Sequence, residues 1–160
     1  MDIKKAVSQD LDAVAELYGA VCDYLADKPF NPNWRRDVFP SREDAEQYLA
    51  AGGLYTARDG GELVGSIALT PEADHILFIQ EVTVHPDRLR QGIGASMLGF
   101  AAKEAAARGA KALRLYVCEG NIPAIRAYEK NGFVRVGTED IGLREFGLDW
   151  FYLYEKRITA

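Results

Sequence analysis

The residues with the clearest chemical potential are two glycines, Gly92 and Gly94, at the start of a predicted helix. An apolar run just before them predicts a strand, so the glycines form the turn between the two elements. The first four N–H groups of a helix lack internal partners and carry the positive end of its dipole, and such a turn can bind phosphate. Alternatively, the glycines serve only to make the turn tight.

Known nucleotide-binding turns do not fit this segment. A P-loop requires Gly-Lys followed by Ser or Thr, which is absent, and the third glycine of the dinucleotide fingerprint would fall at Met97. The sequence therefore predicts a phosphate-binding turn of another kind. The segment that would supply its backbone amides is Arg90-Gln91-Gly92-Ile93-Gly94-Ala95.

The elements around this turn predict one α/β domain over residues 1–160. Strands are expected near 3–7, 54–58, 62–69, 76–84, 113–117, 133–136 and 150–154. Helices are expected near 8–25, 41–51, 93–108 and 123–130. A turn at Thr70-Pro71 is expected to end the third strand. This order indicates an α/β (α+β) fold with a mixed central sheet of about six or seven strands and about four flanking helices. The first half of the sheet is expected to be antiparallel, and a parallel crossover pair follows.

Composition narrows the function classes. The 160 residues are 48% apolar, and 19 Lys and Arg against 24 Asp and Glu give a net charge of −5, which argues against nucleic acid or anionic membranes as partners. No apolar run approaches the ~18 residues of a membrane span and the N-terminus lacks a signal segment, so a cytoplasmic protein is expected. Two cysteines, Cys22 and Cys118, and two histidines are too few to predict a disulfide framework or a metal site.

Two segments resemble the signatures of one enzyme family, the GNAT superfamily of N-acetyltransferases. Residues 82–94, VTVHPDRLRQGIG, resemble its coenzyme A signature, and residues 121–133, NIPAIRAYEKNGF, resemble its second signature. The resemblance implies that the strand backbone binds the pantetheine arm and that the turn amides hold the pyrophosphate of acetyl-CoA, with no metal. The implied coenzyme contacts are Val82, Thr83, Val84, Arg90, Gln91, Gly92, Ile93, Gly94, Ala95, Asn121 and Ala124.

One position departs from the family pattern. Leu89 stands where the family has Arg or Gln, three residues before the first glycine. Arg88 and Arg90 flank it, and either could reach the phosphates. The sequence does not choose between them.

The resemblance also implies two catalytic residues. Tyr128 stands where the family places its general acid, which assists the departing sulfur; packing of its ring is the alternative. Glu81 interrupts an apolar strand just before the coenzyme segment and could accept the amine proton, directly or through water, or be a solvated surface residue. His85 is expected to be a turn residue, and Asn121 to bind the coenzyme, cap the next helix, or do both.

The predicted function is therefore transfer of an acetyl group from acetyl-CoA to a primary amine of a small molecule or peptide, by direct attack in a ternary complex. A non-catalytic coenzyme A-binding sensor with the same fold is the alternative. The family binds acceptors in regions corresponding here to residues 28–40 and 138–149, where Trp34 could stack on the acceptor or simply pack the loop. Family members often dimerise through late strands, which makes a homodimer an expectation, and the acceptor is left open.

Overall fold

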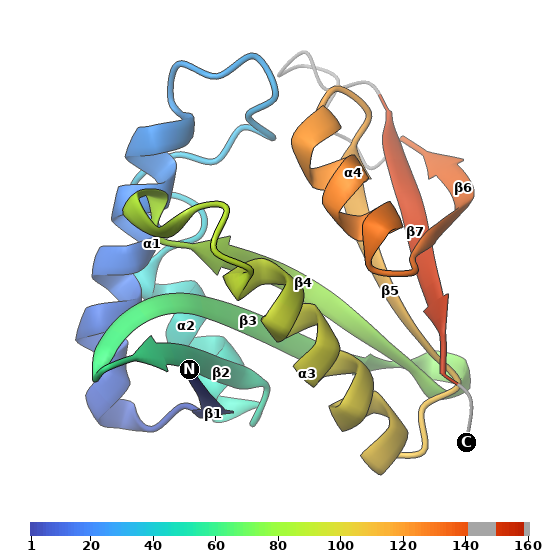
Figure 1. The fold of residues 1–160 in the computed structure, drawn as a ribbon, viewed down its shortest axis with the longest axis horizontal. Coiled ribbons are helices and arrows are strands. Elements are labelled where there is room, and N and C mark those ends of the chain that lie inside the picture. The colour runs from blue at the N-terminus through green and yellow to red at the C-terminus, as the bar shows by residue number, and fades with distance from the viewer. Residues whose placement is uncertain (141–149, 159–160) are drawn as a thin grey trace.

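The computed structural model describes residues 1–140 and 150–158. In this part of the chain one mixed sheet has the strand order β1-β2-β3-β4-β5-β7-β6 (Figure 1). Its strands are β1 (Asp2–Lys5), β2 (Leu54–Asp59), β3 (Glu62–Glu72), β4 (Ile76–Val84), β5 (Ala112–Cys118), β6 (Val134–Glu139) and β7 (Phe151–Arg157). The main helices are α1 (Leu11–Leu25), α2 (Arg42–Ala50), α3 (Ile93–Ala107) and α4 (Ile122–Lys130). None of these helices is both long and apolar enough to cross a membrane.

The predicted fold class is confirmed. Neighbouring strands are antiparallel except for β4 and β5, which are parallel. This parallel ladder is short: residues 76–78 of β4 face residues 112–114 of β5, and the two strands then separate. The sheet is therefore split at its centre over the rest of both strands.

Helices cover the two faces of the sheet differently (Figure 1). Helices α3 and α4 pack on one face, where the larger apolar core includes Ile67, Met97 and Leu113. Helices α1 and α2 pack on the other face of the first strands, where Val14, Tyr18 and other residues form a second core. Each helix buries its apolar side chains in one of these two cores, and this packing fixes α1 and α3 on opposite sides of β4.

Several local signals formed as the sequence predicts. Ser41 Oγ accepts the N–H of Asp44, and the N–H of Ser41 donates to the Asp44 carboxylate, so a capping box begins α2. Gly132 follows α4 with a φ of 89°, the left-handed conformation that ends many helices.

The predicted turn at Thr70-Pro71 is wrong. Strand β3 continues to Glu72, and the turn is formed by residues 73–75. Pro71 pairs with Leu77 on β4, but it lies beyond the end of β2, whose last partner on β3 is Ala68. Because one edge of β3 is unpaired there, a residue without an N–H group can be accommodated in the strand.

Candidate active site

The predicted phosphate turn has the geometry of an open helix N-terminus. The first intrahelical hydrogen bond of α3 is donated by the N–H of Ser96 to the carbonyl of Gly92, at 3.0 Å. The N–H groups that precede Ser96 in this turn therefore have no helical partner. Gly92 has a φ of 80° and Arg90 a φ of 63°, so the chain reaches the helix through a left-handed turn. The predicted amides of residues 90–95 are thus brought together at one helix end.

Space above the turn is also open. A Cβ atom placed on Gly92 would meet nothing within 4 Å, and one on Gly94 would lie 3.8 Å from Val84 Cγ2, an ordinary contact. Packing within the protein therefore does not require Gly94 to be a glycine. Its missing side chain leaves room for a group that approaches the backbone closely.

The structure distinguishes the two arginines that flank Leu89. Arg88 Nη2 lies 2.7 Å from Asp59 Oδ2 and 3.9 Å from Glu62 Oε2, so this side chain is held by the β2–β3 hairpin. Arg90 is exposed and forms no hydrogen bond or ion pair with any residue in the described part of the chain. Arg90 is consequently the one of the two that can turn toward an anion at the helix end.

Where β4 and β5 separate, one edge of the β4 backbone is left without a neighbouring strand in the described part of the chain. Strand β5 pairs only with residues 76–78, while β3 pairs with β4 as far as Val84. From Ile79 to Val84, therefore, the edge of β4 that faces β5 has no strand partner among the described residues. Val82, Thr83 and Val84, the predicted pantetheine contacts, lie in this unpaired stretch and lead directly toward the α3 turn.

A β-bulge decides which way Glu81 points. Ala68 pairs with Glu81 and its neighbour Leu69 pairs with Ile79, which leaves Gln80 as an extra residue on β4. Because side chains alternate between faces, this extra residue moves Glu81 to the face opposite Ile79. Ile79 belongs to the core under α3, whereas Glu81 meets Tyr18 of α1.

Glu81 is a buried carboxyl, not the solvated strand residue that the sequence also allowed. It is 3% exposed, and its Oε1 accepts hydrogen bonds from the hydroxyls of Tyr18 and Ser66, each at 2.9 Å. Burial raises the pKa of Glu81 to about 8, and the hydroxyl groups of Tyr18, Ser66 and Thr83 partly offset that rise. A carboxyl with this pKa can take up and release a proton near neutral pH.

Tyr128 lies on α4 with its ring packed against the larger core. The ring centroid is 6.0 Å from that of Phe133, and the hydroxyl forms no hydrogen bond with the described residues. Burial, with a further contribution from the negative charge of Glu81, raises the pKa of Tyr128 to about 12. The hydroxyl therefore keeps its proton at neutral pH and can donate a hydrogen bond.

Two other predicted residues have structural partners. Asn121 Oδ1 accepts the N–H of Ala124 at 3.3 Å, so Asn121 caps α4. His85 Nδ1 accepts the N–H of Asp87 at 3.1 Å and stabilises the turn after β4, as expected for a turn residue. Neither contact occupies both hydrogen-bonding groups of its side chain.

Trp34 lines a cavity of about 380 Å³ between the end of α1 and the loop after it. Its ring makes an edge-to-face contact with Phe39, with centroids 6.0 Å apart. In the same cavity Arg36 Nη1 is 2.8 Å from Asp23 Oδ2, and a Cβ on Gly19 would lie 2.5 Å from that guanidinium. This position is compatible both with packing of the loop by Trp34 and with stacking of its ring on the acceptor substrate. Part of the second predicted acceptor region, residues 141–149, lies outside the described residues.

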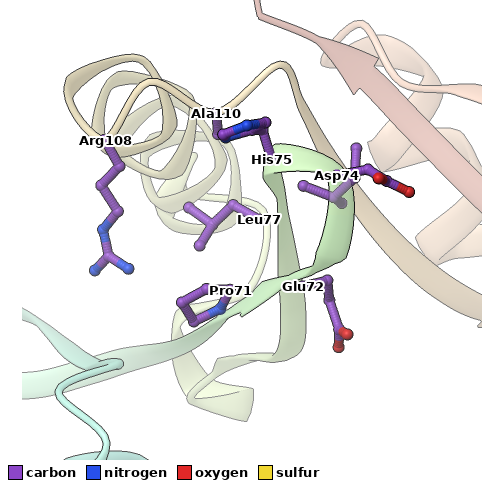
Figure 2. A pocket seen from close by; sticks show the side chains of 8 residues that line it. Pro71, Glu72, Asp74, His75, Leu77, Arg108 and Ala110 are labelled. Carbon is purple, nitrogen blue, oxygen red and sulfur yellow. The ribbon is translucent and has the colours of Figure 1, made fainter.

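A second cavity, of about 340 Å³, is lined by residues that include Pro71, His75 and Arg108 (Figure 2). It is formed by the β3–β4 turn and the C-terminal end of α3, whereas the phosphate turn is at the N-terminal end of that helix. Arg108 on its wall donates to Tyr55 Oη at 2.6 Å and to Glu104 at 3.0 Å. These bonds engage Arg108 within the protein.

The sequence reasoning missed Tyr18 and Ser66. Tyr18 is one of several apolar residues at helical spacing in α1, and Ser66 is a small residue in a strand, so neither stands out. They lie 63 and 15 residues from Glu81 in the chain. The pairing of β3 with the bulged β4 brings Ser66 to Glu81, and the packing of α1 over β4 brings Tyr18 there.

Comparison with known proteins identifies the family of this fold and site. A model of the acetyltransferase (GNAT) family matches residues 19–133, which include the α3 turn, Glu81 and Tyr128. The chain belongs to the GNAT family. Mycothiol acetyltransferase of Thermomonospora curvata is 32% identical over 115 residues, which are 72% of this chain and 38% of that protein. Streptothricin acetyltransferase of Streptomyces lavendulae is 34% identical over 97 residues, 60% of this chain and 48% of that protein. This GNAT chain thus spans less than half the length of either relative.

Solved structures share the whole GNAT fold. Ribosomal-protein-alanine N-acetyltransferase from Brucella melitensis superposes with a TM-score of 0.79 at 22% identity, covering 98% of this chain and 99% of that one. The PaiA N-acetyltransferase from Thermoplasma acidophilum, solved in complex with coenzyme A, gives 0.78 at 22% identity and covers 98% of each chain. At this identity the likeness shows the fold alone.

Proposed function

We propose that this protein is an N-acetyltransferase that transfers the acetyl group of acetyl-CoA to a primary amine of a small molecule or peptide in a ternary complex. The observation that carries the proposal is Glu81, a buried carboxyl of raised pKa placed by a bulge where β4 and β5 separate. It stands just before the coenzyme segment of a GNAT chain.

The residues present fit the donor substrate. The free amides before Ser96 can bind the pyrophosphate, the open space at Gly94 admits it, and the exposed Arg90 can add a charged contact. The unpaired edge of β4 at residues 82–84 can form backbone hydrogen bonds with the amides of the pantetheine arm. This arrangement would direct the thioester into the split between β4 and β5.

In the reaction, the acceptor nitrogen forms a bond with the acetyl carbon while the carbon–sulfur bond breaks. Glu81 accepts the proton that the amine loses, directly or through one water. A free alkylamine has a pKa of ~10.4, so transfer to a carboxyl of pKa about 8 is uphill by about 3 kcal/mol. Transfer to an ordinary carboxyl would be uphill by about 8 kcal/mol. Burial of Glu81 thus makes it a much better base for this reaction.

Tyr128 assists the leaving sulfur. A phenol with a pKa of about 12 is a weak acid toward a thiolate of ~8.5, and complete proton transfer would be uphill by about 5 kcal/mol. Stabilisation of the departing thiolate by a hydrogen bond from the Tyr128 hydroxyl is therefore favoured over full transfer. The thiolate takes its proton from solvent after it leaves.

The test combines binding and turnover. Acetyl-CoA at ~100 times its dissociation constant should raise the unfolding free energy by about 2.7 kcal/mol, which a thermal shift detects. A panel of amines, amino sugars and peptides is then incubated with acetyl-CoA, and release of the thiol and the mass of the product are measured. No thermal shift at millimolar acetyl-CoA would contradict the proposal. A thermal shift without thiol release for any acceptor would favour the sensor function instead.

A further inference from the structure

The two oxygens of Glu81 have different surroundings. Oε1 receives both hydroxyl donors, Tyr18 and Ser66, at 2.9 Å each. Oε2 has no hydrogen-bond partner in the described part of the chain, although it is buried. The Thr83 hydroxyl also lowers the pKa of Glu81, but it donates its hydrogen bond to the carbonyl of Ser66, at 3.4 Å. Hydrogen bonds therefore fix Oε1 of the carboxyl, whereas Oε2 has none with the described residues.

A buried oxygen without a partner is costly to the folded protein. Such a group loses its hydration on folding and gains nothing in return, at a cost of about 1–3 kcal/mol. Its retention on β4, where β4 and β5 have separated, indicates that a partner arrives from outside the described part of the protein. The donor groups that a GNAT reaction brings to this place are the acceptor amine and water.

We propose that Tyr18 of α1 and Ser66 of β3 are positioning residues for acetyl transfer, which hold Oε1 so that Oε2 receives the proton of the acceptor amine. This inference rests on the proposed function. Tyr18 is 1% exposed and Ser66 is fully buried, so both hydroxyls are fixed by packing and not by solvent. With one oxygen held at two points, the carboxyl group cannot rotate to exchange its oxygens without breaking both bonds.

The same hydroxyls set the charge state of the base. A hydroxyl that donates to a carboxylate stabilises its charged form, so each bond lowers the Glu81 pKa against the effect of burial. The other titratable groups that interact with Glu81 are the phenols of Tyr18, Tyr48 and Tyr128, and burial raises the pKa of each. All three phenols are neutral at pH 7 to 9. Glu81 is then the member of this group that titrates near neutral pH.

The direction of the pH effect follows. The base acts in its deprotonated form, so activity rises with pH through the Glu81 pKa. Loss of the Tyr18 donor raises that pKa, and the rising limb of the pH–rate profile moves to higher pH. A shift of about one pH unit is expected for loss of one hydrogen bond to a charged group, and kcat at pH 7 falls roughly tenfold. Above both pKa values the rates of variant and wild type converge.

The experiment measures Tyr18→Phe and Ser66→Ala in two ways. The first is the pH–rate profile with an acceptor found in the panel, together with KM for acetyl-CoA, which should not change. The second is a carbon-13 NMR titration of the Glu81 carboxyl in the acetyl-CoA-free protein, assigned by its loss in Glu81→Gln. The midpoint of the pH–rate profile and the midpoint of the NMR titration should both move to higher pH in each variant. Tyr24→Phe, which alters an exposed tyrosine of the same helix, is the matched control and should change neither.

Each result decides something. A fall in kcat at every pH with an unmoved limb would show that Tyr18 only packs, and it would overturn the inference. A carboxyl midpoint that rises while the pH–rate profile stays unchanged would also overturn it, because the held carboxyl would not be the base. A wild-type protein that transfers no acetyl group would instead overturn the proposed function. The NMR titration would still report whether Tyr18 and Ser66 act on the carboxyl, so the two failures are distinguishable.

Discussion

The donor side and the base side of the candidate site are built by different means. The proposed donor side is the turn before α3, where the backbone amides of six consecutive residues, 90–95, would bind the coenzyme. The base side is assembled from side chains of α1, β3 and β4, which are far apart in sequence. A backbone cradle tolerates variation in side chains, whereas a held carboxyl depends on each partner. The donor side should therefore be shared by proteins that take one coenzyme, and the base side should be particular to this chain.

Loss of the Tyr128 hydroxyl is expected to have the largest effect on turnover, because Tyr128 is proposed to act on the thioester sulfur between the donor side and the base side. Tyr128→Phe retains the ring contact with Phe133, so the fold and acetyl-CoA affinity should be preserved. A hydrogen bond to the charged thiolate is worth about 1.5–3 kcal/mol, or roughly 10- to 150-fold in rate, whereas loss of one neutral hydrogen bond costs about fivefold. We expect kcat to fall at least tenfold, with unchanged affinity by calorimetry. Full activity would reduce Tyr128 to a packing residue.

A side chain at Gly92 should break the donor side alone. Valine there must adopt a φ of 80° and would project into the open space above the amides. Gly92→Val should lose most of the ~2.7 kcal/mol stabilisation that acetyl-CoA confers at 100 times the wild-type dissociation constant. Gly99→Val is the matched control because Gly99 is exposed on the same helix with nothing within 4 Å of a Cβ. Equal loss of binding in both variants would contradict a specific role for the turn.

Substitution of Arg88 or Arg90 should have a smaller effect and should show which of the two contributes to acetyl-CoA affinity. Arg90→Ala should weaken acetyl-CoA binding about fivefold at low salt, since an exposed charged contact is worth about 1 kcal/mol, and added salt should reduce the difference. Arg88→Ala should leave affinity unchanged and lower the melting temperature, because Arg88 is bonded to Asp59. Calorimetry and thermal unfolding of both variants provide the measurement. The reverse pattern would assign the phosphate contact to Arg88.

Sequence predicted the strand, turn and helix of the proposed donor side well, because their causes are local. A strand, two glycines and a helix are adjacent in the chain, and the amides they present follow from helix geometry. The order and type of the strands followed from alternation and turn residues in the same way. The turn at Thr70-Pro71 failed because the tolerance of proline in a strand depends on whether the neighbouring strand has ended, which is not local information.

The base side could be predicted only in part. Glu81 was identifiable as a carboxyl in an apolar strand, but its direction depends on the bulge at Gln80, which no residue type signals. An unbulged strand would have turned Glu81 toward α3 and left Tyr18 without a partner. Neither the burial nor the raised pKa of Glu81 could be read from sequence, since both arise when α1 packs over β4.

The pH–rate profile of Glu81→Gln, measured with the calorimetric affinity for acetyl-CoA, tests the central claim most directly. Glutamine keeps the size of the side chain but cannot accept a proton at neutral pH. We predict that affinity is nearly unchanged and that turnover rises only at higher pH, because the limb set by a carboxyl of pKa about 8 is lost. An unchanged pH–rate profile would show that Glu81 is not the base, and it would contradict the division of the site into a backbone donor side and a side-chain base side.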